Sequence, residues 1–172
     1  MLIAIFLLTA LSVPATEADV LAHLRSGKML CSNPDSTTKT CSTIDTFTSV
    51  ADGAFVDTGE LLLSPDKPVT LEVSSIVRIE NGAICGSMEL PDLQRGRVRF
   101  NGSLVPPDRN ALLLDRIVEA LKPLAGRKVC EALRTEAGQL VKYGQVERAD
   151  LNLPGKPVKW ITSDEGYKVA PR

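Results

Sequence analysis

The chain has 172 residues, with 20 basic against 21 acidic side chains and a formal net charge of -1 at pH 7. Charges are scattered along it, so neither nucleic-acid binding nor steering to an anionic membrane has electrostatic support. The length fits one domain with its own core, and no repeat or linker separates a second one. No phosphate-binding glycine motif is present, so we expect no cofactor.

The chain opens with an apolar stretch typical of an export signal. Residues 1–13 are mostly apolar, Pro14 ends the run, and small residues follow before Glu17. Such a run is too short to cross a hydrocarbon core of about 30 Å. We therefore expect residues 1–18 to be a signal peptide, cut after Ala15 or Ala18, and residues 19–172 to form one periplasmic or secreted, soluble domain without a membrane span.

Four cysteines, all beyond the expected cut, indicate disulfides in an exported chain. We expect Cys31 to pair with Cys41 and Cys85 with Cys130, because the turn-forming residues between the first two bring their ends together easily. Zinc is not expected, since no pair has CxxC spacing and the only histidine, His23, lies in another segment. The missing CxxC also argues against a redox-active pair.

Taken in chain order, the pattern predicts a short helix followed by many strands. Residues 18–26 have apolar side chains at helical spacing and a glycine just beyond. Strands are expected at 28–31, 43–50, 54–63, 69–73 and 75–80. Asn81-Gly82 suits the tight turn of an antiparallel hairpin, and Asn101-Gly102 repeats that signal after a half-exposed strand at 95–100.

The strongest helix signal opens over residues 106–108, and Pro123 ends or kinks that helix. Leu114, Ile117, Val118 and Leu121 form its apolar face. Residues 127–133 are ambiguous between helix and strand, and strands are expected again at 140–146 and 158–162. The fold class expected from this order is α+β: a mostly antiparallel sheet with one long helix packed on one face, plus the short N-terminal helix.

Catalytic candidates are weak in every class. His23 has no evident partner nearby in sequence. The S-x-x-K spacing occurs twice, at Ser36 to Lys39 and at Ser64 to Lys67, so it discriminates little. Asp57 with Glu60, or Asp150 with a distant partner, could form an acid/base pair for glycoside hydrolysis. No residue is assigned as catalytic, cofactor-binding or metal-binding.

Aromatic residues gather near the end of the chain, at Tyr143, Trp160 and Tyr167. On an open face they would bind a protein or glycan partner, whereas under the long helix they would be core. The chain looks in general like small exported proteins of bacterial envelopes. We expect a non-catalytic protein that binds a macromolecule or supports the envelope; the alternatives are a small exported hydrolase and an enzyme inhibitor presenting the loop between Cys31 and Cys41.

Overall fold

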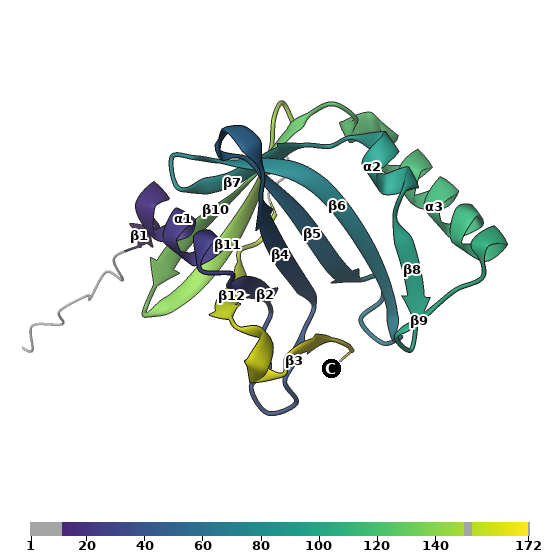
Figure 1. The fold of residues 1–172 in the computed structure, drawn as a ribbon, viewed down its shortest axis with the longest axis horizontal. Coiled ribbons are helices and arrows are strands. Elements are labelled where there is room, and N and C mark those ends of the chain that lie inside the picture. The colour runs from purple at the N-terminus through teal and green to yellow at the C-terminus, as the bar shows by residue number, and fades with distance from the viewer. Residues whose placement is uncertain (1–11, 150–152, 172) are drawn as a thin grey trace, which may run out of the picture.

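The computed structural model describes residues 12–149 and 153–171, and its main feature is a closed barrel of eight antiparallel strands (Figure 1). The barrel strands are β2 Met29–Ser32, β4 Thr43–Ser49, β5 Phe55–Leu62, β6 Val69–Glu80, β7 Ala83–Ser87, β10 Lys128–Glu136, β11 Gln139–Val146 and β12 Lys156–Ile161. Each strand pairs with the next in this order, and β12 pairs back to β2.

The remaining elements lie at the ends and sides of the barrel. The helices are α1 Glu17–Arg25, α2 Leu90–Gln94 and α3 Pro107–Leu121, with the 3-10 turns η1 Ala51–Gly53, η2 Lys122–Leu124 and η3 Ser163–Glu165. The short strands are β1 Val13–Pro14, β3 Thr40–Cys41, β8 Arg97–Phe100, β9 Ser103–Leu104 and β13 Lys168–Val169.

The predicted fold class, an α+β sheet with the long helix packed on one face, is wrong. The antiparallel strands close on themselves, and α3 lies beside the barrel against α2 and β8 (Figure 1). Closure depends on the pairing of β7 with β10, two strands separated by the long insertion that contains α2, β8, β9 and α3. Hydrophobic alternation defines the two faces of each strand but does not show whether the sheet closes.

The geometry of the turn between β6 and β7 explains why Asn and Gly occupy it. Asn81 and Gly82 have φ values of 52° and 79°, as a two-residue hairpin turn requires. A Cβ at Gly82 would lie 2.2 Å from the carbonyl oxygen of Ala15, so the close approach of the chain before α1 also requires glycine.

Residues on either side of Ala15 belong to the folded structure. β1 pairs with the end of β10, and the amide of Ala15 donates to the carbonyl oxygen of Leu133 at 2.9 Å. Thr16 then caps α1, since its hydroxyl accepts from the amide of Asp19. The apolar run of the expected signal peptide, residues 1–11, lies outside the described residues.

One disulfide links Cys31 to Cys41 and the other links Cys85 to Cys130. These are the pairs expected from the sequence. Cys85 and Cys130 stand opposite each other on β7 and β10, so their bond crosses the pairing that closes the barrel. Disulfides are typical of proteins that fold in an oxidising compartment. In the described part of the chain, no helix has both the length and the apolar character needed to span a membrane.

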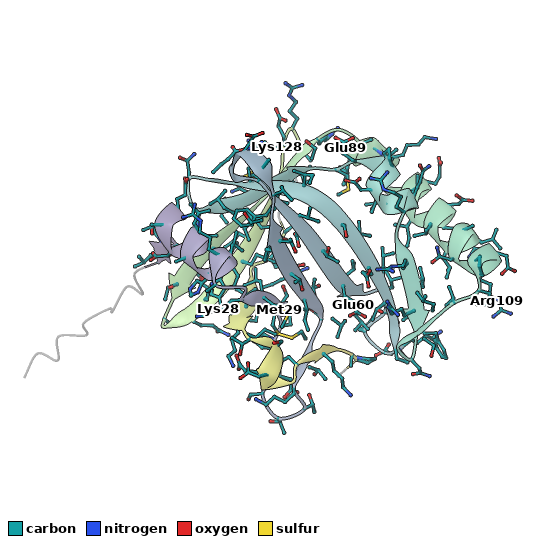
Figure 2. The ribbon with its side chains drawn as sticks, in the orientation of Figure 1. Lys28, Met29, Glu60, Glu89, Arg109 and Lys128 are labelled. Carbon is teal, nitrogen blue, oxygen red and sulfur yellow. A yellow bond between two sulfur atoms is a disulfide. The ribbon has the colours of Figure 1, made fainter. Side chains whose placement is uncertain are left out.

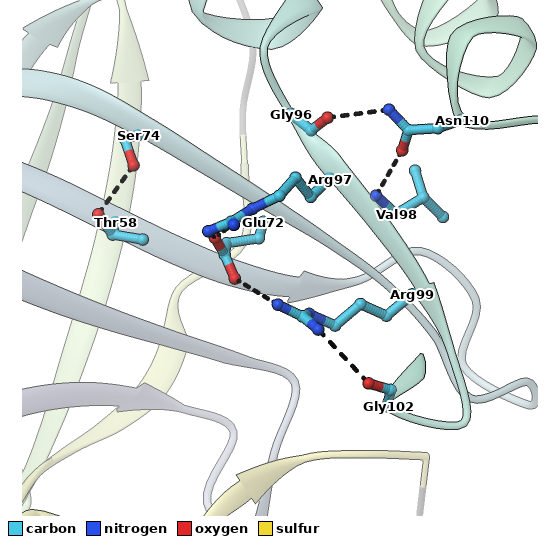
Figure 3. Close-up of polar contacts among 9 residues, drawn as sticks. All are labelled: Thr58, Glu72, Ser74, Gly96, Arg97, Val98, Arg99, Gly102 and Asn110. Atoms are coloured by element: carbon cyan, nitrogen blue, oxygen red, sulfur yellow. Dashed lines mark hydrogen bonds and ion pairs between the residues drawn. The ribbon is translucent and has the colours of Figure 1, made fainter. Parts of the chain in front are cut away.

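Polar contacts join the parts of the insertion between β7 and β10 to one another and to the barrel (Figure 3). The Asn110 amide group at the start of α3 accepts from the Val98 amide at 2.7 Å and donates to the Gly96 carbonyl at 3.1 Å. On β6, Glu72 pairs with Arg97 and Arg99 of β8. Strand β8 and helix α3 therefore sit in a fixed position on the first half of β6.

Candidate functional site

The inside of the barrel is divided into layers, and the middle layer is charged. At one end, α1 contributes Val20 and Leu24 to an apolar cluster with inward side chains of the strands, such as Phe47, Phe55 and Leu133. At the other end, Leu114 of α3 packs on Leu71 and Val98. Between these clusters lie Asp45, Asp57, Glu131 and Lys142, one on each of β4, β5, β10 and β11.

Lys142 is the cation of this layer. Its Nζ lies 2.9 Å from Glu131 Oε2 and 3.3 Å from Asp45 Oδ2, and its side chain is only 8% exposed. Burial alone would lower the pKa of Lys142, but the carboxylates of Asp45 and Glu131 outweigh that effect and hold the pKa above its usual range. Lys142 is therefore charged at pH 7.

The charged layer has room partly because Gly59 has no side chain. Gly59 stands opposite Asp45 in the pairing of β4 with β5. A Cβ at Gly59 would lie 3.0 Å from Asp45 Oδ1, so a larger residue would push the carboxylate away from Lys142.

Asp57 differs from the other two carboxyl groups because no cation pairs with it. Its Oδ1 is buried and has no hydrogen-bond partner among the described residues. Burial, together with the nearby carboxylates of Asp45 and Glu131, raises the pKa of Asp57 to about 8, although Lys142 acts in the opposite direction. Asp57 is thus mostly a neutral carboxylic acid at pH 7.

Asp57 and Glu131 face a cavity of about 300 Å³ inside the barrel. Strands β5, β6, β7 and β10 form its wall, and α2 lies at its mouth with Glu89 and Asp92; Figure 2 labels Glu89 near α2. The apolar lining consists of Leu61, Val73, Val77, Ile84, Met88, Leu93 and Val129. The volume is at the small end of the range for ligand pockets, roughly 300–1,000 Å³, and an eight-stranded barrel can enclose one small ligand.

The structure separates the carboxylate pair considered from the sequence. Asp57 points into the barrel, whereas Glu60 accepts a hydrogen bond from the hydroxyl of Thr70 on the outer face. The two positions differ by an odd number, so they lie on opposite faces of β5. Asp150 lies outside the described residues. Asp57 instead shares its cavity with Glu131, which the sequence reasoning did not consider.

The other catalytic candidates lie in separate places. Ser36 and Lys39 are in the turn of the Cys31–Cys41 loop, and Ser64 and Lys67 are in the connection before β6, so neither S-x-x-K is on a helix. His23 stacks on Trp160 with ring centroids 4.8 Å apart.

The three aromatic residues proposed as a partner-binding face have three different surroundings. Trp160 packs against the apolar cluster beneath α1. Tyr143 donates its hydroxyl to Glu136 on β10. Tyr167 packs beside the Cys31–Cys41 disulfide, with Lys39 Nζ 4.8 Å and Lys159 Nζ 5.0 Å from its ring centroid. Trp160 is therefore scaffold, and the three rings do not form one platform.

A signal for the charged layer does exist in the sequence. Glu131 lies between Val129 and Leu133 at a spacing of two, and Asp57 follows Phe55 in the same way, so each charge falls on the apolar face of its strand. A charge on such a face indicates a buried polar group that needs a partner. The sequence of each strand alone does not show which of the charged residues are in contact.

The chain matches no family model, no curated protein and no solved structure. The site is therefore interpreted from its own geometry. Among the described residues there is no group of three or more side chains placed to hold a metal ion.

Proposed function

We propose that this chain is an exported, non-catalytic protein that binds a small ligand inside its barrel. The cavity carries the proposal: four strands and α2 form its walls, its lining is mainly apolar, and Asp57 in that lining has one buried carboxyl oxygen, Oδ1, without a hydrogen-bond partner among the described residues. An unpaired buried polar atom is unfavourable, and a ligand that bonds to it would remove that penalty.

The binding proposal is tested by filling the cavity. Val129→Phe places a larger side chain in the lining, and Val73→Phe does the same from β6. The control is Ile76→Phe, because Ile76 is 54% exposed. Native mass spectrometry of the protein isolated from its source, with thermal-shift screening of small amphipathic molecules, should detect a guest in the natural chain and the control but not in the filled variants. Equal binding by all four proteins would refute an internal site.

Export is supported by the two disulfides and by the position of the expected cut. Either cut removes β1 and the hydrogen bond from Ala15 to Leu133. A cut after Ala15 keeps the Thr16 cap and all of α1 in the mature protein, whereas a cut after Ala18 also removes the cap and two residues of the helix. We therefore propose Thr16 as the mature N-terminus. Sequencing the N-terminus of protein recovered from the extracytoplasmic fraction tests this, and an uncut protein recovered from the cytosol would contradict export.

Hydrolysis is the second candidate, since Asp57 and Glu131 line one cavity and only Glu131 forms an ion pair with Lys142. A neutral Asp57 could donate a proton, and Glu131, paired with Lys142, could serve as base or nucleophile. The small volume of the cavity favours binding of a small molecule over the cleavage of a sugar chain. Turnover of aryl glycosides that is lost in both Asp57→Asn and Glu131→Gln would favour hydrolysis, and no turnover would leave binding as the function.

A further inference from the structure

The charges that line the cavity are all of one sign. Asp57 and Glu131 lie in its wall, Glu89 just before α2 and Asp92 on α2 lie at its mouth, and its lining contains no lysine, arginine or histidine. Lys142 reaches Glu131 but is not part of the lining. A cavity with this lining attracts cations and repels anions.

The carboxyl groups that line the cavity differ in whether they already have a partner in the protein. Asp92 pairs with Arg95 beside the mouth, and Glu131 bonds to Lys142 through Oε2. Asp57 has neither kind of partner among the described residues, and its Oδ1 is buried. Asp57 is therefore the group in the wall that most needs a hydrogen-bond donor from a ligand.

The apolar lining restricts the kind of cation. Aliphatic side chains from all four strands and from α2 cover most of the wall, so a small metal ion would lose water without gaining enough oxygen ligands there. A cation that carries its own apolar body would bury that body against the aliphatic residues and place only its charged end at the acids.

We propose that the ligand is a small organic amine, bound with its ammonium group at Asp57 and Glu131 and its hydrocarbon part against Val77, Ile84 and Val129. This inference rests on the proposed binding function and names its ligand class. The ammonium N–H groups donate to the two carboxylates. Asp57 gives up its proton to solvent as the ammonium enters, so one proton leaves the protein for each amine bound.

The groups that face Asp57 set this proton release. Asp45 on β4, Glu131 on β10 and Lys142 on β11 act on Asp57, and Glu89, just before α2, and Asp92, on α2, line the same cavity. Of these only Lys142 is cationic, and Asp45 and Glu131 already engage it. A second positive charge beside Asp57 is therefore favoured most strongly when Asp57 is ionised.

The test uses three probes of equal length: hexylammonium, 1-hexanol and hexanoate, titrated calorimetrically into the full folded protein at pH 6, 7 and 8. We expect hexylammonium to bind most tightly and hexanoate least. Below the pKa of Asp57, the amine affinity should rise about tenfold per pH unit. Parallel titrations in two buffers of different ionisation enthalpy should count about one released proton per amine at pH 6.

Substitutions test which carboxyl group is responsible for amine binding and for its dependence on pH. Asp57→Asn keeps the shape and neutrality of the protonated acid, so it should fold, lose at least tenfold in amine affinity at pH 8 and show no pH dependence. Asp115→Asn, on the exposed side of α3, is the matched control and should bind as the natural chain does. Glu131→Gln should weaken amine binding and move its pH dependence to lower pH, because the Glu131 carboxylate helps to raise the pKa of Asp57.

The outcomes separate this inference from the proposed function. If 1-hexanol binds as tightly as the amine and Val129→Phe abolishes both, the barrel holds a ligand but the amine assignment is wrong. Amine binding that does not change between pH 6 and 8, or that persists unchanged in Asp57→Asn, also overturns the inference. If none of the three probes binds and the isolated protein carries no guest, both proposals fail.

Discussion

Lys142 is a buried cation with two acidic partners inside the barrel, and removing it leaves those acids without compensation. Breaking a buried ion pair from one side typically costs about 3–5 kcal/mol, because the remaining charge stays desolvated. We expect Lys142→Met to lower the free energy of unfolding by about this amount at pH 7, measured by urea denaturation.

The control for that variant is Lys122→Met, which removes an exposed pair with Glu119 at the end of α3. An exposed pair of this kind contributes about 0.5 kcal/mol or less. A loss of similar size in both variants would show that Lys142 is not compensating buried acids.

Asp57 gives the stability of the protein a specific dependence on pH. Its pKa is about 8 in the fold, above the ordinary value of about 4 that applies to the unfolded chain. Between these values the folded chain binds more protons than the unfolded chain, so stability falls as pH rises through this window. The amide in Asp57→Asn does not ionise, so this variant does not lose stability as the pH rises through the window. We expect it to be more stable than the natural chain by about 1–3 kcal/mol at pH 8.

The advantage of Asp57→Asn should shrink towards pH 4, where Asp57 is protonated in the folded chain and about half protonated in the unfolded chain. Thermal denaturation of the two proteins across pH 4–8 checks this. A constant difference between them over the whole range would contradict the raised pKa.

At the residue scale, the sequence permitted only part of the site to be predicted. Asp57 was a candidate acid, but its expected partner, Glu60, lies on the opposite face of β5. Glu131 and Lys142 were overlooked because residues 127–133 were ambiguous between helix and strand, so the pairing of β10 with β11 that brings the two side chains together was not predicted. The partners of a charge depend on the closed shape, and that shape is not encoded in any single strand.

At the scale of elements, Asn110 joins α3 to β8 through two hydrogen bonds of its side-chain amide (Figure 3). Asn110→Ala would leave the amide of Val98 and the carbonyl of Gly96 without these bonds, and we expect a loss of about 1–3 kcal/mol. Hydrogen exchange at the Val98 amide should accelerate. Arg109→Ala, one residue earlier on the helix and exposed, is the control and should change neither quantity.

Single elements were predicted more successfully than their assembly. The N-terminal helix, the helix beginning after Pro106 and the Asn-Gly turns are all present close to their expected positions. Local signals, such as capping residues and residues that tolerate positive φ, determine these features. The ambiguous segment 127–133 became part of β10, since its pairing with β7 and β11 decided between helix and strand.

At the scale of the whole molecule, the two disulfides should contribute unequally. On the chain-entropy model, the Cys85–Cys130 bond, with a sequence separation of 45, contributes about 4 kcal/mol, and the Cys31–Cys41 bond, with a separation of 10, about 2.7 kcal/mol. The larger loop also contains the insertion between β7 and β10. We expect the double variant C85S/C130S to lose more stability in urea than C31S/C41S.

The barrel would remain closed by hydrogen bonds in both variants, so each should still fold at low temperature. If C31S/C41S were the less stable variant, the loop between those two cysteines would matter more to the fold than the β7–β10 closure.

The closed barrel places an acid that has no cationic partner beside an apolar cavity, and the proposals on ligand and function depend on this arrangement. Titration of the Asp57 side-chain carboxyl carbon by NMR tests it most directly. We predict a midpoint of about pH 8 in the free protein and a lower midpoint when hexylammonium is added. A midpoint at the ordinary aspartate value of about 4, unmoved by the amine, would contradict the account.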